Sequence, residues 1–130
     1  MKKSWTDDEL KKLSDSFEGR PPQEALKWVV ENFETGEFAL ASSFAEAALV
    51  DMLVKLKKDA RVFLIDTGFL FKETLDVVKR VEEKYGMKVE RHSSGMTLDE
   101  MEKRYGKNLW EKDPDKCCEL RKVLPLREVL

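Results

Sequence analysis

Hydrophobic positions along the chain follow two spacings in turn. Short apolar runs predict buried strands at residues 38–41 and 62–65, and alternating polarity predicts a third strand at 88–92. Apolar residues three or four positions apart predict helices over 44–58 and 72–85. This alternation of strands and helices is typical of a doubly wound parallel sheet, so we predict an α/β fold with helices on both faces of the sheet.

Two helices are predicted before the first strand. The first begins at a capping box, Thr6-Asp7-Asp8-Glu9, and ends at Gly19. Pro21-Pro22 opens the second helix, which should run to about Phe33. We expect these helices to form an N-terminal layer, residues 1–34, within one domain that spans residues 1–130.

The C-terminal part of the chain carries shorter signals. Thr97, with Glu100 three residues later, is a second capping box and predicts the start of a helix. A polar loop is predicted from Gly106 to Lys116. Helical spacing returns at Glu119, and we expect Pro125 to interrupt it.

Composition narrows the classes of function. The 130 residues are 42% hydrophobic and 38% charged, which is typical of a soluble globular domain rather than a disordered chain. Lys plus Arg is 24 and Asp plus Glu is 26, and the resulting net charge of −2 argues against a general nucleic-acid binder. No apolar run approaches the roughly 18 residues of a membrane span, and the N-terminal segment lacks the apolar stretch of a signal peptide. We therefore expect a cytoplasmic protein that does not enter a membrane.

The last residues, Val129-Leu130, lie inside a helical pattern that has no cap. This pattern predicts a domain that is cut before its natural end. Such a domain exposes apolar surface, which favours a homo-oligomer.

The first candidate site follows the first predicted strand. Ligands of doubly wound sheets bind beyond the carboxyl ends of the strands, and Ser42-Ser43-Phe44 lies there, at the predicted entry to a helix. Backbone amides at a helix start, together with two hydroxyls, suit a phosphate or sulfate oxygen. The alternative is that serine serves only as the helix cap.

The second candidate site, Asp66-Thr67-Gly68-Phe69, follows the second predicted strand. Gly68 permits a sharp turn and a close approach of ligand to backbone. Asp66 and the neighbouring amides could hydrogen-bond a base or ribose edge. The alternative is an ordinary turn in which Asp66 is the local acceptor.

The third candidate site holds both cysteines of the chain, Cys117 and Cys118, followed by Arg121 and Lys122. Adjacent cysteines do not easily close an unstrained disulfide, whereas thiolates are ligands for iron and zinc. The two basic residues favour anions nearby, but two thiolates do not complete a metal site. The alternative is two incidental thiols, one buried and one exposed. His92, the one histidine, is expected to be solvated rather than a ligand.

Four segments together carry a family resemblance. They are Phe38–Phe44 (FALASSF), Leu64–Thr74 (LIDTGFLFKET), Asn108–Pro114 (NLWEKDP) and Lys116–Leu126 (KCCELRKVLPL). In this order and spacing the chain resembles the sulfonucleotide reductases of sulfate assimilation, the adenylyl-sulfate and phosphoadenylyl-sulfate reductases, over about residues 21–130. The resemblance implies an adenine nucleotide alpha-hydrolase-like (PP-loop) fold, here C-terminally incomplete.

The resemblance also implies an activity and a role for each segment. Such enzymes use thioredoxin or glutaredoxin to reduce a sulfonucleotide to sulfite, through a cysteine S-sulfonate. The segment of Ser42, Ser43 and Phe44 would face the phosphosulfate, and Asp66, Thr67, Gly68 and Phe69 would line the adenosine pocket. Cys117 and Cys118 would supply two of four ligands to a [4Fe-4S] cluster of the kind found in enzymes that use adenylyl sulfate, with Arg121 and Lys122 between cluster and substrate.

Two departures from the family pattern stand out. No residue of the chain corresponds to the family's nucleophilic cysteine, which lies in a later segment, so we expect the chain alone to be inactive. The family also has a glycine after Ser-Ser-Phe, whereas Ala45 follows Phe44 here. Loss of that glycine would crowd the backbone where the anion should approach.

The expected function is therefore a thioredoxin-dependent adenylyl-sulfate reductase. One alternative is a 3′-phosphoadenylyl-sulfate reductase, although cluster-free members usually lack the cysteine pair. Another is a non-enzymatic module that binds adenine nucleotides. An adenylating PP-loop enzyme is disfavoured because it needs a Ser-Gly-Gly-x-Asp-Ser-like loop, which residues 42–45 do not provide.

Overall fold

A parallel sheet lies at the centre of the computed structural model, which describes residues 4–130. Its strands are β1 (Leu40–Ala41), β2 (Val62–Asp66) and β3 (Glu90–Ser93), in the spatial order β1-β2-β3. All the pairings are parallel, as the strand–helix alternation predicts.

The register sets where each strand ends. Ala41, the last residue of β1, pairs with Phe63 near the start of β2, while Asp66 at the end of β2 pairs with Ser93 of β3. The chain therefore leaves β1 well before β2 and β3 end. Directly after β1, the Ser42 amide donates to the Phe63 carbonyl at 3.0 Å.

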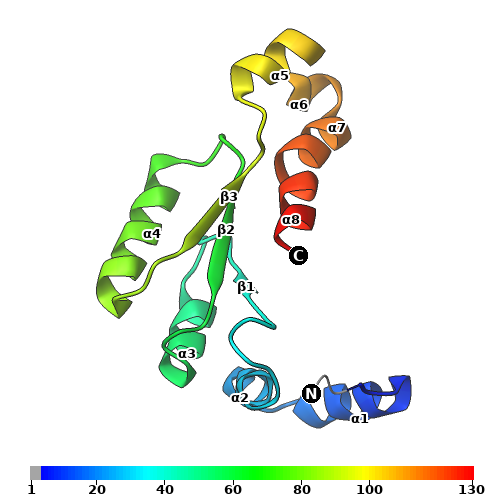
Figure 1. Cartoon of the computed structure of the whole chain (residues 1–130), viewed down its shortest axis with the longest axis vertical. Coiled ribbons are helices and arrows are strands. Elements are labelled where there is room, and N and C mark those ends of the chain that lie inside the picture. Colours follow the sequence, from blue (N-terminus) through cyan, green and yellow to red (C-terminus); the bar gives the residue numbers. More distant parts are fainter. Residues whose placement is uncertain (1–3) are drawn as a thin grey trace.

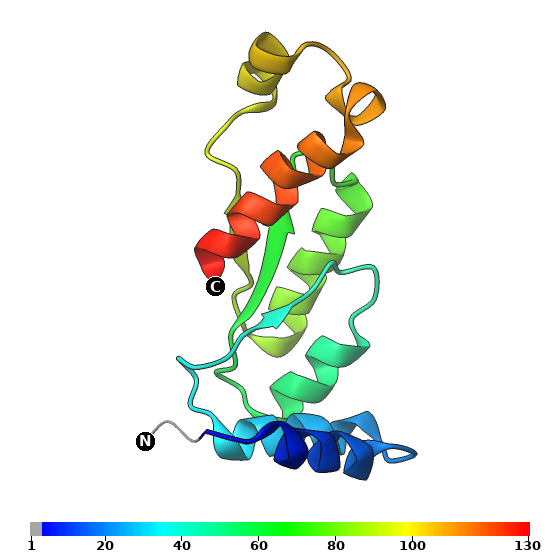
Figure 2. The same ribbon diagram turned by 90° about the vertical axis from the view of Figure 1, so that its right-hand side faces the viewer.

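Helices cover both faces of the sheet, which confirms the predicted α/β fold. α3 (Ala48–Leu56) and α4 (Lys72–Tyr85) lie on one side of the strands, and α8 (Leu124–Val129) lies on the other, preceded by the π-helical turn η1 (Glu119–Val123) (Figures 1 and 2). α4 has the predicted bounds and ends at Gly86, whose left-handed backbone (φ 60°) glycine adopts without strain.

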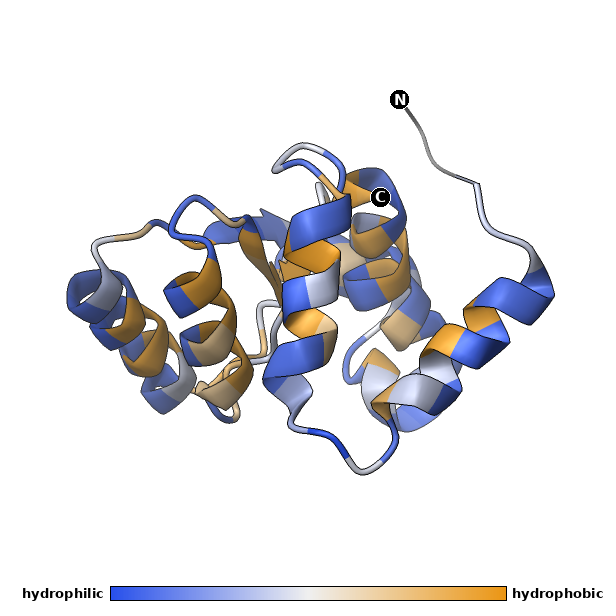
Figure 3. Ribbon diagram, turned by 90° about the horizontal axis from the view of Figure 1, so that it is seen from below, coloured by the Kyte–Doolittle hydropathy of each residue, from blue (hydrophilic) through white to orange (hydrophobic). Residues whose placement is uncertain are grey.

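The main core fills the space between the sheet and its helices. β2 contributes an apolar run because the strand is buried on both faces. The buried members are Phe44, Val50, Val54, Val62, Leu64, Val78, Val81 and Val89. Seen from below, the helices carry hydrophobic residues along one side and hydrophilic residues along the other, as the spacing predicts (Figure 3).

The N-terminal helices α1 (Asp7–Phe17) and α2 (Pro22–Asn32) lie at the end of the molecule opposite α5 (Figure 1). The predicted capping box is present, since Thr6 Oγ1 accepts a hydrogen bond from the Glu9 amide and the Glu9 carboxylate accepts one from the Thr6 amide. None of the helices within residues 4–130 has the length and apolar character needed to cross a membrane.

The predicted polar loop from Gly106 to Lys116 is wrong. After α5 (Leu98–Tyr105), this segment forms two short helices, α6 (Leu109–Lys112) and α7 (Pro114–Cys118). Leu109 is buried, which anchors α6, and the Asp113 carboxylate caps α7 by accepting from the Lys116 amide at 3.1 Å. Helices this short, held by one buried leucine and one cap, show no repeating apolar pattern in the sequence.

Pro125 does not interrupt the C-terminal helix, contrary to the sequence prediction. It lies in the first turn of α8, where a missing amide hydrogen costs little. In η1 the backbone is wound more widely, and the Leu124 amide bonds the Glu119 carbonyl five residues earlier. The chain therefore continues from η1 into α8 without a break at Pro125.

Candidate functional site

The three candidate segments meet beyond the carboxyl ends of β1 and β2. A hollow of about 500 Å³ lies between these strand ends and the helical segment η1–α8. Its polar lining residues are Ser42, Ser43, Thr67, Cys118 and Lys122, which come from all three segments. The rest of its wall is apolar and includes Leu64, Leu70 and Leu126.

A second hollow of about 510 Å³ shares one wall with the first. Thr67, Leu70, Cys118 and Lys122 line both. The second hollow adds Phe69, Trp110, Pro114, Cys117 and Arg121. The structure thus brings together eight of the eleven predicted site residues, all except Phe44, Asp66 and Gly68.

The serine segment does not form the predicted helix start. α3 begins at Ala48 rather than at residue 44, and its N-terminal amide at Ala48 is bonded by the Glu46 carboxylate (2.7 Å). Ser42 Oγ accepts instead from the Phe44 amide at 3.1 Å. The hydroxyls therefore cap no helix, and the alternative that serine serves only as the helix cap is wrong.

Phe44 points into the protein and not toward the hollow. It is 2% exposed and belongs to the main core, while its backbone has φ 56°, in the left-handed region that bulky residues seldom adopt. Burial of the ring fixes this conformation, and the conformation delays the start of α3. A direct contact of the Phe44 side chain with a ligand in the hollow does not fit this placement.

The Asp-Thr-Gly segment forms a tight turn directly after β2. Asp66 Oδ1 accepts from the Gly68 amide at 2.9 Å, and Thr67 Oγ1 accepts from the Phe69 amide at 3.2 Å. Gly68 has φ 82°, which favours glycine. Asp66 is thus the local acceptor of the turn, and the Phe69 ring projects from it toward Trp110, with ring centroids 5.3 Å apart.

The two basic residues of the third segment point to different places. Arg121 is 5% exposed, and its Nε donates to the Thr67 carbonyl at 2.7 Å. The Lys122 side chain is exposed, lines both hollows, and forms no hydrogen bond or ion pair with the residues from 4 to 130. Lys116, by contrast, is held by Glu119 at 3.1 Å, and this ion pair raises the pKa of Lys116. Lys122 is therefore the cation available to an anion in the hollows.

The cysteines are both free, with Cys117 buried and Cys118 exposed. Cys117 packs with Met101, Leu109 and Leu120, and both thiols line the second hollow. No group of three or more His, Cys, Asp and Glu residues suited to a metal occurs within the described part of the chain. The chemistry of two adjacent thiols that line one hollow suits half of a four-thiolate iron–sulfur site.

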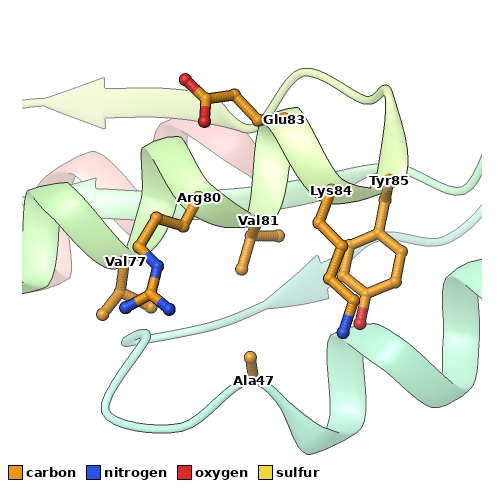
Figure 4. Close-up of a pocket in the computed structure, with 7 residues that line it drawn as sticks. All are labelled: Ala47, Val77, Arg80, Val81, Glu83, Lys84 and Tyr85. Atoms are coloured by element: carbon orange, nitrogen blue, oxygen red, sulfur yellow. The ribbon is translucent and has the colours of Figure 1, made fainter.

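A separate hollow of about 620 Å³ lies between α4 and the start of α3. Arg80 and Lys84 extend toward the segment at Ala47, while Glu83 points away (Figure 4). It contains none of the residues that the sequence singles out. This hollow is not part of the candidate site.

The sequence matches a described protein family over most of its length. Residues 37–130 match the phosphoadenosine phosphosulfate reductase domain. The chain belongs to this family. The resemblance on which the sequence prediction rests is thereby confirmed.

Named relatives of this reductase domain agree with the assignment. Adenosine 5′-phosphosulfate reductase 1 of Bacillus subtilis (strain 168) is 39% identical over 107 residues, covering 81% of this chain and 46% of the relative. Adenosine 5′-phosphosulfate reductase of Geobacillus kaustophilus is 36% identical over 129 residues, covering 97% of this chain and 54% of the relative. The chain spans about half the length of the curated relatives it matches.

A solved structure of the family has the same fold. The phosphoadenylyl-sulfate reductase of Candida auris, in a phosphate complex, superimposes with a TM-score of 0.81 at 28% sequence identity. The match covers 99% of this chain and 64% of that protein. The α/β architecture is therefore that of the reductase domain.

Sequence reasoning missed two contributors to the site of this reductase domain. Trp110 is 48% exposed and packs edge-on against Phe69, and the Met96 carbonyl accepts from Arg121 Nη1 at 2.5 Å. A tryptophan in a polar segment was a usable signal for the first. A backbone carbonyl leaves no trace in the sequence, so the second was not predictable.

Proposed function

We propose that the chain is the nucleotide-binding part of an adenylyl-sulfate reductase, which reduces adenylyl sulfate to sulfite and AMP with thioredoxin or glutaredoxin as reductant. One observation carries the proposal. The first hollow gathers the hydroxyls of Ser42 and Ser43, the Cys118 thiol and the Lys122 cation at the carboxyl edge of the sheet. The names of the relatives from Bacillus and Geobacillus support the choice of substrate.

The charges of the hollow suit a substrate with several negative oxygens. The Lys122 ammonium has no carboxylate partner within residues 4–130, so an anion there gains an ion pair without breaking one. The serine hydroxyls can donate to phosphate or sulfate oxygens from the opposite wall. Phe69 and Trp110 offer apolar ring surface for the adenine of the nucleotide.

The reaction that this substrate requires is a displacement at sulfur. A cysteine thiolate attacks the sulfur of adenylyl sulfate, the bond between that sulfur and the bridging phosphate oxygen breaks, and AMP leaves with the electron pair. A thiol of the reductant then attacks the sulfur of that cysteine, so that sulfite leaves and a mixed disulfide forms. The second thiol of the reductant attacks the mixed disulfide, which closes a disulfide within the reductant and frees the cysteine. We assign the nucleophile to neither Cys117 nor Cys118, because both face the hollow as ligand candidates. Lys122 would stabilise the charge that develops on the leaving phosphate.

Cys117 and Cys118 would hold one edge of a [4Fe-4S] cluster in this proposal. When bound, the cluster would supply a redox-active, charged centre held by these thiols. The chain's own contribution is to fix the two thiols. Burial of Cys117 against Met101 and Leu109 holds one sulfur, and the helical path through α7 and η1 sets the direction of the other.

A second candidate function is the reduction of 3′-phosphoadenylyl sulfate. It is favoured by the structural match to the Candida auris enzyme. The two candidates differ by one phosphate on the ribose. Relative affinity for the two sulfonucleotides therefore separates them.

The test is equilibrium binding to this chain, measured by calorimetry with adenylyl sulfate, 3′-phosphoadenylyl sulfate and AMP. We expect adenylyl sulfate to bind and Lys122→Met to weaken it roughly tenfold, since a charge-assisted hydrogen bond contributes about 1.5–3 kcal/mol. Lys79→Met, an exposed lysine of α4 that lines neither hollow, is the matched control and should leave affinity unchanged.

Three results would change the conclusion. Tighter binding of 3′-phosphoadenylyl sulfate would favour the second candidate. Absence of binding by all three nucleotides would contradict a nucleotide site here. Binding without sulfite release by a version of the chain extended by the family's nucleophilic-cysteine segment, supplied with iron and thioredoxin, would favour a non-enzymatic binding module.

A further inference from the structure

Arg121 occupies an unusual position for a charged side chain at this site. It is 5% exposed, yet it forms no ion pair with any carboxylate in the part of the chain that the structure describes. Both of its hydrogen bonds go to backbone carbonyls, from Nε to Thr67 (2.7 Å) and from Nη1 to Met96 (2.5 Å). Buried guanidinium groups usually pair with carboxylates, so this geometry calls for a different explanation.

The two carbonyls belong to segments that are distant in sequence. Thr67 lies in the turn after β2, 54 residues before Arg121, and Met96 lies between β3 and α5, 25 residues before it. Neither segment belongs to a helix or strand, so neither is held by the repeating backbone hydrogen bonds of regular secondary structure. One planar guanidinium therefore ties both segments to η1, with its donors in a fixed fork.

The turn is shaped to receive the guanidinium closely. A Cβ atom on Gly68 would lie 2.8 Å from Arg121 Nη2, and the backbone there has φ 82°. Only glycine fits both the conformation and the space. Gly68 and Arg121 are thus matched parts of one contact.

The neighbouring lysine shows what an anion-facing group looks like in this site. Lys122 is exposed and lines both hollows, whereas Arg121 turns its nitrogens inward to the backbone. Consecutive residues of a helical turn point in different directions, so Arg121 faces the backbone while Lys122 faces the hollows. The sequence resemblance places both residues between cluster and substrate and does not separate them.

We propose that Arg121 is a positioning residue, which holds the Thr67–Phe69 turn and the Met96 segment in place so that the turn can receive the adenosine, while Lys122 alone of the pair contacts the anion. The inference about adenosine rests on the proposed function. The clamping of two segments rests only on the geometry of the structure.

The binding test compares a neutral ligand with an anionic one. Arg121→Met removes both hydrogen bonds. We expect it to weaken the binding of adenosine and of adenylyl sulfate by the same factor, at least about tenfold, because the variant loses the ordered turn rather than a charge that contacts the ligand. Lys122→Met should weaken adenylyl sulfate and leave adenosine unchanged. Affinities are measured well below each variant's melting temperature, so that a loss of folded protein alone would not change them. A loss confined to adenylyl sulfate in Arg121→Met would overturn the proposal.

Hydrogen exchange tests the clamp without any ligand. The amides of Gly68, Phe69 and Met96 are each hydrogen-bonded to a side chain of their own segment, and we expect all three to exchange faster in Arg121→Met. Lys122→Met should leave them unchanged. Unchanged exchange at both segments in Arg121→Met would overturn the inference. If the unaltered chain binds neither ligand, the proposed function fails, and the exchange result still decides whether Arg121 is a clamp.

Gly68→Ala provides the second variant should Arg121→Met fail to fold. Its added methyl group would displace the guanidinium from the Thr67 side, so with Arg121 present it should reproduce faster exchange at Phe69 and at Met96. Gly95→Ala is the matched control, because nothing lies within 4 Å of a Cβ at Gly95. Faster exchange at Phe69 alone would show that the two segments are not coupled through Arg121, and would overturn the proposal.

Discussion

The sheet core and the small apolar cluster around Cys117, here called the cysteine region, are built differently. The core joins α3, α4 and the strands through eight buried residues, seven of them aliphatic. The cluster has four buried members among the described residues, Met101, Leu109, Cys117 and Leu120, drawn from α5, α6, α7 and η1. Each of these helical pieces is short, and each contributes one side chain.

The difference indicates how the site is held. Apolar burial stabilises the sheet at about 25 cal/mol per Å² and needs no particular partner geometry. The cysteine region buries little apolar surface and relies on directed contacts, such as the Asp113 cap of α7 and the bonds of Arg121. We therefore expect the sheet to set the global stability and the cysteine region to open locally at lower cost.

The largest effect is expected in the sheet core. Leu64→Ala on the central strand, where Leu64 is 2% exposed, should lower the free energy of unfolding by about 3 kcal/mol through lost burial and the cavity it leaves. Urea denaturation measures the loss. Leu10→Ala, at a leucine 45% exposed on α1, is the matched control and should cost far less. Equal losses would show that the core does not dominate stability.

A smaller and local effect is expected in the cysteine cluster. Met101 is 3% exposed within a small cluster, and Met101→Ala should cost about 2 kcal/mol through the lost burial of its side chain. Hydrogen exchange should accelerate in α5 to α7 and stay unchanged in β2. If β2 amides accelerate equally, the two regions unfold as one unit and the comparison fails.

The two capping boxes offer a matched pair of helix starts. Thr97→Ala should cost about 1 kcal/mol, since Thr97 Oγ1 accepts from the Glu100 amide at 3.1 Å and α5 carries the buried Met101. Thr6→Ala removes the same cap from α1, a helix with no fully buried residue, so it should change the melting temperature less. A larger shift for Thr6→Ala would mean that α1 contributes more to the fold than its burial indicates.

The smallest effect is a pH dependence on β3. Hydrogen bonds from Arg61, and then from His92, lower the pKa of Glu90 from 4.5 to about 2. Because the folded pKa lies below the unfolded one, the stabilisation is present above about pH 4.5 and is lost as pH falls toward 2. The pair is partly exposed, so we expect under about 1 kcal/mol.

Urea midpoints of the unaltered chain and of Glu90→Gln, compared at pH 6 and at pH 2.5, measure the contribution of the Glu90 charge to stability. The variant should be less stable at the higher pH, and the difference should shrink at the lower pH. A difference that does not change with pH would assign the contribution to packing rather than to charge.

Local signals predicted the helices and strands well where several agreed. The spacing over 72–85 and the capping boxes at Thr6 and Thr97 gave elements that the structure confirms. The signals failed where one long-range contact overrode them. Burial of Phe44 delays α3, and a single buried leucine orders α6 inside a segment predicted to be loop.

The sequence by itself determined the α/β order, the family and the three segments that form the candidate site, because periodicity, caps and motifs are written in neighbouring residues. Only the tertiary structure decided which side chains of those segments face the hollows. Phe44 turns into the core, and Asp66 accepts a hydrogen bond within its own turn. Arg121 reaches 54 residues back to Thr67, while Lys122 lines both hollows. The orientation of these side chains depends on contacts between residues that are distant in sequence, and a local sequence pattern does not contain that information.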